Sequence, residues 1–204
     1  MISAVITAVF AVVYLLATVW LCRGVKLNAR ALCLGGVICA LTLVLAPIRI
    51  PLPTGSNITC GSWIPLMLLA LLYDYRLSMV TGWVCGILAM ILIPGWQAVH
   101  WAQIFVQQLV CFSCLGYAGV FGADKRWKAV CGMTLAVFLR CCGHVLSGVI
   151  FYSQNAWDGW GAWGYSLAYN LSSRLPEGIL SILIVSLLPL AFMRRSMMKE
   201  GGAA

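Results

Sequence analysis

Residues 128–152 read KAVCGMTLAVFLRCCGHVLSGVIFY, a run in which only Lys128 and Arg140 are charged. A transmembrane α-helix needs about 20 predominantly apolar residues to cross a hydrocarbon core about 30 Å thick. The run therefore predicts a membrane-spanning helix. It would carry Arg140, His144 and Ser147 at membrane depth, where polar side chains are costly and tend to be functional.

The composition of the whole chain agrees with a membrane protein. Of its 204 residues, 63% are hydrophobic and 9% are charged, and the mean hydropathy is +0.99. A soluble domain carries about 25% charged residues, so this chain could not cover a water-facing surface. We therefore predict an all-α integral membrane protein. The net charge is +8. In a soluble protein this would suggest a nucleic-acid partner, but in a membrane protein the distribution of the basic residues among the loops indicates orientation.

Seven apolar segments are candidate membrane helices: residues 2–22, 31–48, 63–74, 77–94, 102–121, 128–152 and 174–193. The third looks too short to span alone, and only the turn Asp74-Tyr75-Arg76 separates it from the fourth. The first segment could be read as a signal peptide. It lacks a basic start and is long enough to span, so we predict a retained helix.

Basic side chains fall in alternate connections between these segments: Arg23, Lys26, Arg30, Arg76, Lys125, Arg126, Lys128, Arg194, Arg195 and Lys199. The other connections, at 49–62, 95–101 and 153–173, hold Arg49 and Asp158 as their only clear charges. Lys and Arg are enriched in cytoplasmic loops. The pattern predicts an N-terminus outside and a C-terminus in the cytoplasm.

Aromatic side chains are concentrated in the last of the predicted outer loops: Trp157, Trp160, Trp163, Tyr165 and Tyr169. One interpretation is an aromatic belt at the level of the lipid headgroups. The other is a lid over a ligand site, because the cluster is confined to one loop and lies beside polar intramembrane residues. The sequence leaves both open.

The segments 102–121 and 128–152 carry polar residues at membrane depth, and more follow along the chain: Gln103, Gln107, Gln108, Arg140, His144, Ser147, Asn170, Arg174 and Glu177. If the two segments run antiparallel, their outer halves hold Gln103, Gln107, His144 and Ser147, which would line a pocket that opens to the outside. Structural roles are the alternatives. Glutamines and histidines can hydrogen-bond between membrane helices. Arg140 could be neutralised by a carbonyl or by Glu177, and Arg174 could form a surface pair with Glu177, three residues away.

The sequence lacks the motifs of common hydrolases, metalloproteases and ATPases. The sequence has no G-x-S-x-G, H-E-x-x-H or Walker A motif and no paired carboxylates. Its five acidic residues give little support to ion coupling through buried carboxylates. Cys111 and Cys114 form a C-x-x-C with no second pair or nearby histidine. We therefore predict binding or transport with no cofactor or metal, not an enzyme, and with energy supplied by other proteins.

Three motifs resemble one known family. They are VHWAQIFVQQLVCFSCLGYAG at 99–119, the pattern R…H-x-x-S-G-V-I-F at 140–151, and YSLAYN…LPE at 165–177. A weaker match is PTGS at 53–56 ahead of WIP at 63–65. Over residues 31–193 the chain resembles the thiamine-specific S-component, the substrate-binding membrane subunit, of energy-coupling factor (ECF) vitamin transporters.

The resemblance implies an architecture and partners. It implies a six-helix core over 31–193, an additional N-terminal helix with a basic loop over 1–30, and a basic cytoplasmic tail over 194–204. It also implies a transmembrane coupling subunit and two ATPase subunits in the plasma membrane. The small residues Gly36 and Ala40 stand where the family docks on its coupling subunit. Ordinary packing within the bundle is the alternative for this pair.

The resemblance also implies a thiamine site. His144, Tyr165 and Asn170 match residues that contact the pyrimidine or line its pocket, with Ser147 and Gly148 beside them. Tyr152 matches a stacking aromatic, and Trp157 resembles a further pocket aromatic. Faces of aromatic rings attract cations such as the thiazolium of thiamine.

One pair departs from the family pattern. Gln107 and Gln108 stand where the family has an acidic residue followed by tyrosine. Glutamine cannot offer a charge-assisted hydrogen bond to an aminopyrimidine, so we expect weaker thiamine binding or a thiamine relative as ligand. The alternative functions are a stand-alone transporter or channel for a small cationic solute, and a membrane enzyme that uses His144 as a base.

Overall fold

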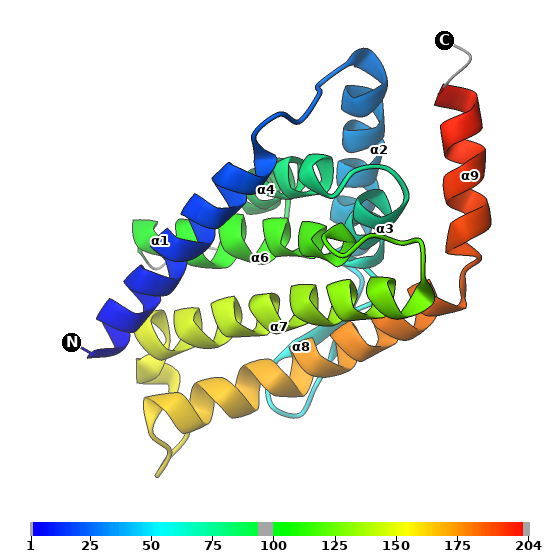
Figure 1. Ribbon diagram of the computed structural model, residues 1–204. Coiled ribbons are helices and arrows are strands. Elements are labelled where there is room, and N and C mark those ends of the chain that lie inside the picture. The colour runs from blue at the N-terminus through cyan, green and yellow to red at the C-terminus, as the bar shows by residue number, and fades with distance from the viewer. Residues whose placement is uncertain (1, 94–99, 202–204) are drawn as a thin grey trace.

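The computed structural model describes residues 2–93 and 100–201 (Figure 1). In chain order the elements are α1 (Ile2–Cys22), α2 (Ala29–Leu45), β1 (Arg49–Pro51), β2 (Asn57–Thr59), α3 (Ile64–Leu72), α4 (Tyr75–Leu92), α5 (Trp101–Gln103), η1 (Ile104–Val110), α6 (Cys111–Ser113), η2 (Cys114–Gly119), α7 (Arg126–Phe151), η3 (Ser153–Asn155), α8 (Ala162–Leu187) and α9 (Leu190–Gly201). Most of the predicted loop 95–101 and the last residues of the predicted tail lie outside the described residues.

Local sequence signals explain several helix starts. The Asn28 side chain caps α2 by accepting a hydrogen bond from the backbone N–H of Ala31 at 2.8 Å, and Asp74 caps α4 through Arg76 at 2.8 Å. Such caps satisfy backbone donors that have no partner inside the helix. The capped Asp74 turn therefore separates α3 from α4, as the sequence predicted.

Three of the described helices, α1, α4 and α7, are long and apolar enough to cross a membrane. A fourth span is possible if α8 and α9 count together, although they meet at an angle of 69° next to Pro189. The 17-residue α2 is about 26 Å long at 1.5 Å per residue, slightly less than the hydrocarbon core. The segments expected at 63–74 and 102–121 form a short helix and a rod of four helical pieces.

The rod from α5 to η2 lies between α4 and α7, and α7 runs beside α8 (Figure 1). Glycines permit these close contacts. A Cβ atom at Gly132 of α7 would collide with the carbonyl oxygen of Ala118, and one at Gly119 would collide with that of Ala70. The small residues at the end of the 99–119 motif therefore serve helix packing.

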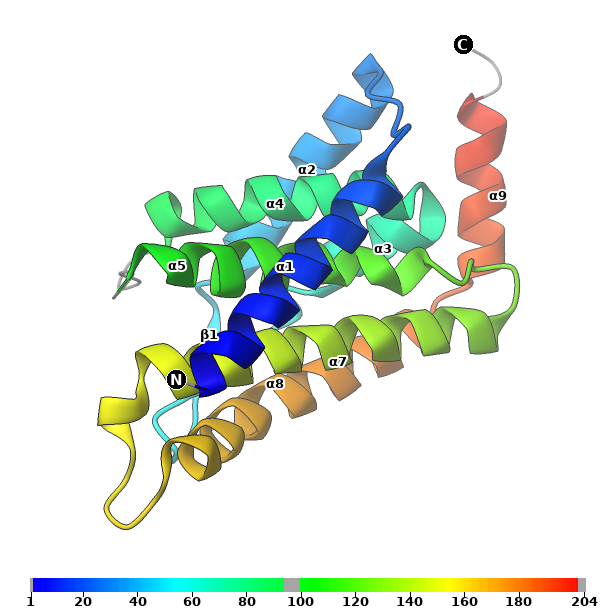
Figure 2. The same ribbon diagram turned by 60° about the vertical axis from the view of Figure 1, so that its left-hand side comes forward.

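Helix α1 lies across α4, the rod and α7 (Figure 2). Two buried hydrogen bonds attach it: Tyr14 to Ser113 at 2.7 Å and Thr18 to Tyr117 at 2.9 Å, each between hydroxyl groups. Its other face exposes mainly valines and isoleucines, as a lipid-facing surface does. The first apolar segment is therefore a packed part of the bundle.

The aromatic loop is shorter than the sequence predicted. Helix α8 begins at Ala162, so Trp163, Tyr165 and Tyr169 lie on its first turns and not in a loop over 153–173. Residues 162–173 read as a loop because they are polar and aromatic, yet their buried side is covered by α7. Likewise, residues 190–201 form α9, so the basic tail is helical through Gly201.

The predicted outer loop 49–62 contains a hairpin in an otherwise helical chain. Strands β1 and β2 pair antiparallel, with Arg49 opposite Thr59 and Pro51 opposite Asn57. Its tip lies against α8, where Tyr169 donates to the carbonyl of Gly55 at 3.2 Å. The hairpin therefore covers the middle of α8.

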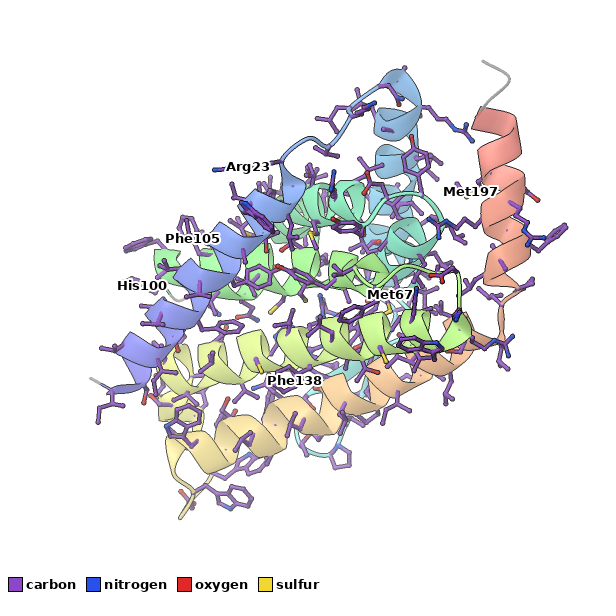
Figure 3. All side chains as sticks on the ribbon, in the orientation of Figure 1. Arg23, Met67, His100, Phe105, Phe138 and Met197 are labelled. Atoms are coloured by element: carbon purple, nitrogen blue, oxygen red, sulfur yellow. The ribbon has the colours of Figure 1, made fainter. Side chains whose placement is uncertain are left out.

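Basic residues occur where α1 ends, where α2 and α7 begin, and along α9. Arg30 donates to the carbonyl of Met197 at 2.9 Å, which joins the start of α2 to α9. Lys128 pairs with Asp124 at 2.9 Å near the start of α7. In Figure 3, Arg23 and Met197 lie toward the top of the view and His100 at its left edge.

Candidate functional site

A polar cavity lies among α7, α8, η1 and the β1–β2 hairpin, and it has two lobes. The first, here called the aromatic lobe, has a volume of about 270 Å³. The second, the arginine lobe, has a volume of about 160 Å³. Both lobes are lined by Arg49, Gln107, His144 and Arg174. Because the walls share these four residues, the two lobes are direct neighbours.

Most of the predicted site residues line the aromatic lobe. In addition to the shared four, its lining residues are Ser147, Gly148, Tyr152, Asn155, Tyr165, Tyr169 and Asn170. The arginine lobe adds Gln108 and Arg140 together with Asn57, Thr59, Ser62 and Trp63. Asn57, Thr59, Tyr169 and Arg174 were not among the predicted ligand contacts.

Helix α7 supplies one continuous wall of the cavity. Arg140, His144 and Ser147 follow one another at intervals of four and three residues, which places them on the same helix face. All three are at most 8% exposed. The interior position of Gly148 lets α8 approach, since a Cβ atom there would collide with the Ser166 hydroxyl. Ser166 donates to the carbonyl of Val145 at 2.7 Å across this contact.

The glutamines lie on η1, a π-helical segment. The π-helix has a wider turn than the α-helix and occurs often at functional sites. Gln107 accepts hydrogen bonds at its Oε1 atom from Gln103 at 2.7 Å and from Ser147 at 3.1 Å. Gln103 also donates to the Tyr152 hydroxyl at 2.7 Å. Gln107 therefore both links η1 to α7, as the structural interpretation predicted, and lines the cavity.

The aromatic wall is built by α8 and the preceding loop. The Tyr165 and Tyr169 ring centroids are 5.6 Å apart. Trp157 packs edge-on against Tyr165 with centroids 5.1 Å apart, but it does not line either lobe. Its contact supports Tyr165 from behind, so a direct ligand contact for Trp157 has no support from the geometry.

Arg140 is held by rings and a carbonyl. Its guanidinium carbon lies 4.5 Å from the centroid of Trp63 and 5.0 Å from that of Phe112. Its Nη1 atom donates to the carbonyl of Cys111. The carbonyl alternative for this arginine is therefore confirmed, and such cation–π contacts add stability when they are desolvated.

Glu177 pairs with Arg174 and not with Arg140. Arg174 Nη1 lies 3.5 Å from Glu177 Oε2. The carboxylate is 1% exposed and also accepts from the hydroxyls of Thr59 and, at 3.3 Å, Ser62. The pair is therefore a buried junction between α8 and the hairpin segment, not the surface pair that the sequence suggested.

The sequence did not predict that the hairpin residues Arg49, Asn57 and Thr59 line the cavity. One signal was present: Arg49 is one of only two clear charges in the predicted outer loops. The weaker motif match at 53–56 was another. Neither signal showed that this loop folds back over α8, because a contact between residues more than 100 positions apart leaves no local pattern.

Comparisons with known proteins identify the family. A family model described as thiamine transporter protein matches residues 32–197. The thiamine transporter ThiT of Bacillus subtilis is 27% identical over 157 residues, which cover 71% of this chain and 81% of that protein. ThiT of Lacticaseibacillus paracasei is 29% identical over 139 residues, covering 61% and 69%.

A solved structure supports the fold. The structure of ThiT from Listeria monocytogenes superposes with a TM-score of 0.70 at 23% identity, covering 81% of this chain and 96% of that one. The chain is accordingly an all-α membrane protein, apart from its short hairpin. Every residue that lines the cavity falls within the 32–197 match. The predicted resemblance is thus confirmed, and the chain belongs to the thiamine transporter protein family.

Proposed function

We propose that this protein is the substrate-binding subunit of an ECF-type importer and that it captures thiamine or a close relative from outside the cell. The observation that carries the proposal is the convergence of His144, Tyr165 and Asn170 on one lobe of about 270 Å³. These three residues come from two helices and match the family's motif. Their membership of one cavity supports a shared ligand.

The chemistry of the aromatic lobe suits the proposed ligand. Ligand sites commonly combine apolar or aromatic walls with a few polar groups that fix orientation. Tyrosine rings from α8 and the end of α7 supply flat surfaces for stacking. His144 and Asn170 supply hydrogen-bonding groups for an aminopyrimidine edge.

A fluorescence titration tests this proposal. The chain contains nine tryptophans, and Trp157 touches the wall of the aromatic lobe through Tyr165. We expect thiamine to quench tryptophan emission of the purified protein at sub-micromolar concentration. The absence of a response to thiamine, its phosphates and its pyrimidine half would contradict a thiamine-related ligand.

Restoring a carboxylate at position 107 should tighten thiamine binding. In Gln107→Glu the carboxylate can still accept from Gln103 and Ser147, so the local network is preserved. A charged hydrogen bond contributes more than a neutral one, so we expect a gain of about 1 kcal/mol. Calorimetric titration measures it. Gln154→Glu is the matched control, because Gln154 is exposed and lines neither lobe; equal affinities of both variants would refute the effect.

The partner surface proposed at Gly36 and Ala40 lies on α2. Both residues are exposed and line an apolar groove of about 1020 Å³ between α2 and α4. A Cβ atom at Gly36 would meet nothing within 4 Å. Small residues spaced by four let another helix approach closely. These features support docking of a transmembrane coupling subunit, which two ATPase subunits would drive.

Filling this groove should separate binding from transport. Gly36→Leu places a side chain in open space, so thiamine binding should persist while uptake with the partner subunits falls at least tenfold. Radiolabelled uptake by cells that express all subunits measures the difference. Val37→Leu is the control, because Val37 is exposed on the same helix but does not line the groove. Wild-type uptake by Gly36→Leu would reject the docking surface.

We further propose an orientation with the N-terminus outside and the C-terminus in the cytoplasm. The basic residues at the ends of α1, α2 and α7 and on α9 support it. In this arrangement residues 31–193 form the six-helix core and α1 is an addition. The stand-alone transporter remains the competing function, and thiamine uptake by vesicles that contain this chain alone would favour it.

A further inference from the structure

The arginine lobe is positively charged, which does not suit thiamine, itself a cation. Three of its lining residues are Arg49, Arg140 and Arg174, and no Asp or Glu lines either lobe within the described part of the chain. Guanidinium groups remain protonated in proteins. The walls therefore carry three positive charges, whereas the thiazolium of thiamine is itself a cation.

Within the described residues, the carboxylate that pairs with one of these arginines already has other hydrogen-bond partners. Glu177 accepts from Thr59 and Ser62 and pairs with Arg174. Arg140 is held by a backbone carbonyl and two ring faces, and Arg49 donates from Nε to the carbonyl of Ala46 at 3.2 Å. Among the described residues, three positive charges thus face one negative charge at this site.

Buried hydrogen-bond donors point to the same conclusion. The side-chain atoms Trp63 Nε1, Arg140 Nε, Arg174 Nε and His144 Nε2 are buried and have no hydrogen-bond partner within the described structure. All four residues line the arginine lobe. Trp63, Arg140 and His144 are 1%, 5% and 8% exposed. Three of these atoms, Trp63 Nε1, Arg140 Nε and Arg174 Nε, are N–H donors. Leaving a buried donor unsatisfied costs about 1–3 kcal/mol, so the wall of this lobe has more hydrogen-bond donors than acceptors to pair with them.

We propose that the arginine lobe is an anion subsite, and that the preferred ligand carries a phosphate group on the aromatic moiety held in the aromatic lobe. This inference rests on the proposed function and narrows its ligand class to phosphate esters of thiamine or of its pyrimidine half. Arginine forks bind phosphate oxygens in pairs. The four residues shared by the two lobes make them neighbours, as a single ligand with an aromatic part and a phosphate part requires.

Gln107 and Gln108 are consistent with an anion subsite. A carboxylate at position 107 or 108 would offset the positive charge of the lobe, and the neutral amides preserve it. The family's acidic residue suits a cationic vitamin. The neutral amides that replace it here suit a ligand that carries a negatively charged phosphate.

Matched ligand pairs test the anion subsite. The full-length protein in detergent is titrated calorimetrically with thiamine and thiamine monophosphate, and with the hydroxymethyl aminopyrimidine and its phosphate ester. The members of each pair differ only by the phosphate. We expect the phosphate ester to bind at least tenfold more tightly in both pairs, and inorganic phosphate to compete with it.

Two arginine variants locate the effect. Arg174→Gln should reduce the preference for the phosphate ester at least tenfold, and Arg49→Gln, at an exposed position that tolerates substitution, should reduce it in the same direction. Arg23→Gln at the end of α1 is the control and should retain the preference. Equal or weaker binding of both esters would overturn the anion subsite while leaving thiamine binding intact. Failure of all four compounds to bind would overturn both the subsite and the proposed function.

Discussion

Replacing Glu177 with alanine is expected to destabilise the protein by about 3–5 kcal/mol, the usual cost of removing one partner from a buried ion pair. The substitution leaves the Arg174 guanidinium without its carboxylate and removes the acceptor of Thr59 and Ser62. Because these contacts join α8 to the hairpin segment, the hairpin should loosen. Thermal unfolding in detergent and hydrogen exchange over residues 49–59 measure the two effects.

Glu177→Gln is the informative comparison. Its amide oxygen can still accept from Thr59 and Ser62, but it loses the charge that faces Arg174. We expect an intermediate loss of stability and largely preserved exchange protection in the hairpin. If alanine and glutamine variants unfolded at the wild-type temperature, the junction would contribute nothing to the fold and the hairpin would have to be held by its contacts with Tyr169 and Ser172 alone.

Replacing His144 with leucine is expected to weaken ligand binding at least tenfold without loss of stability. His144 lines both lobes, and its buried Nε2 atom has no partner within the described structure. Removing an unsatisfied buried polar group relieves a cost in the ligand-free protein. The thermal midpoint should therefore stay constant or rise, while the affinity for thiamine or its phosphate falls by about 1.4 kcal/mol or more. Calorimetry and thermal unfolding on the same preparation separate the two quantities.

Phe138→Leu is the matched control on α7. Phe138 is 62% exposed and does not line the cavity, so neither affinity nor stability should change. The helix-packing interpretation of His144 makes the opposite prediction to ours: a marked drop in the thermal midpoint with ligand affinity unaffected in the folded fraction. The signs of the two changes therefore distinguish a binding residue from a packing residue.

The fold was predictable wherever one segment determined its own structure. Helices α1 and α7 begin and end within two residues of the predicted bounds, because a long apolar run defines a membrane helix by itself. Helix α8 begins twelve residues before the predicted Arg174, since its first turns are polar and become helical only against α7. The hairpin was missed because its three-residue strands are too short to show an alternating pattern.

The site shows the same division. The family resemblance implied His144, Ser147, Tyr165 and Asn170 as site residues, and all four line the aromatic lobe, although their contacts with a ligand stay predictions. Trp157 does not line the cavity and packs on Tyr165, so its contact with a ligand also stays a prediction. The π-helical form of η1, the segment that carries Gln107, has no local sequence signal.

By itself the sequence determined that this chain is an α-helical membrane protein of the thiamine transporter type. Both features are local: the hydropathy of a segment is a sum over consecutive residues, and a motif is defined by residues close together in the sequence. Only the tertiary structure decided the charge of the cavity. Arg49, Arg140 and Arg174 come from the hairpin, α7 and α8, and each has a plausible structural role when read alone. Their meeting in one lobe depends on long-range packing, and the field that a ligand experiences is the sum over all groups that packing brings together.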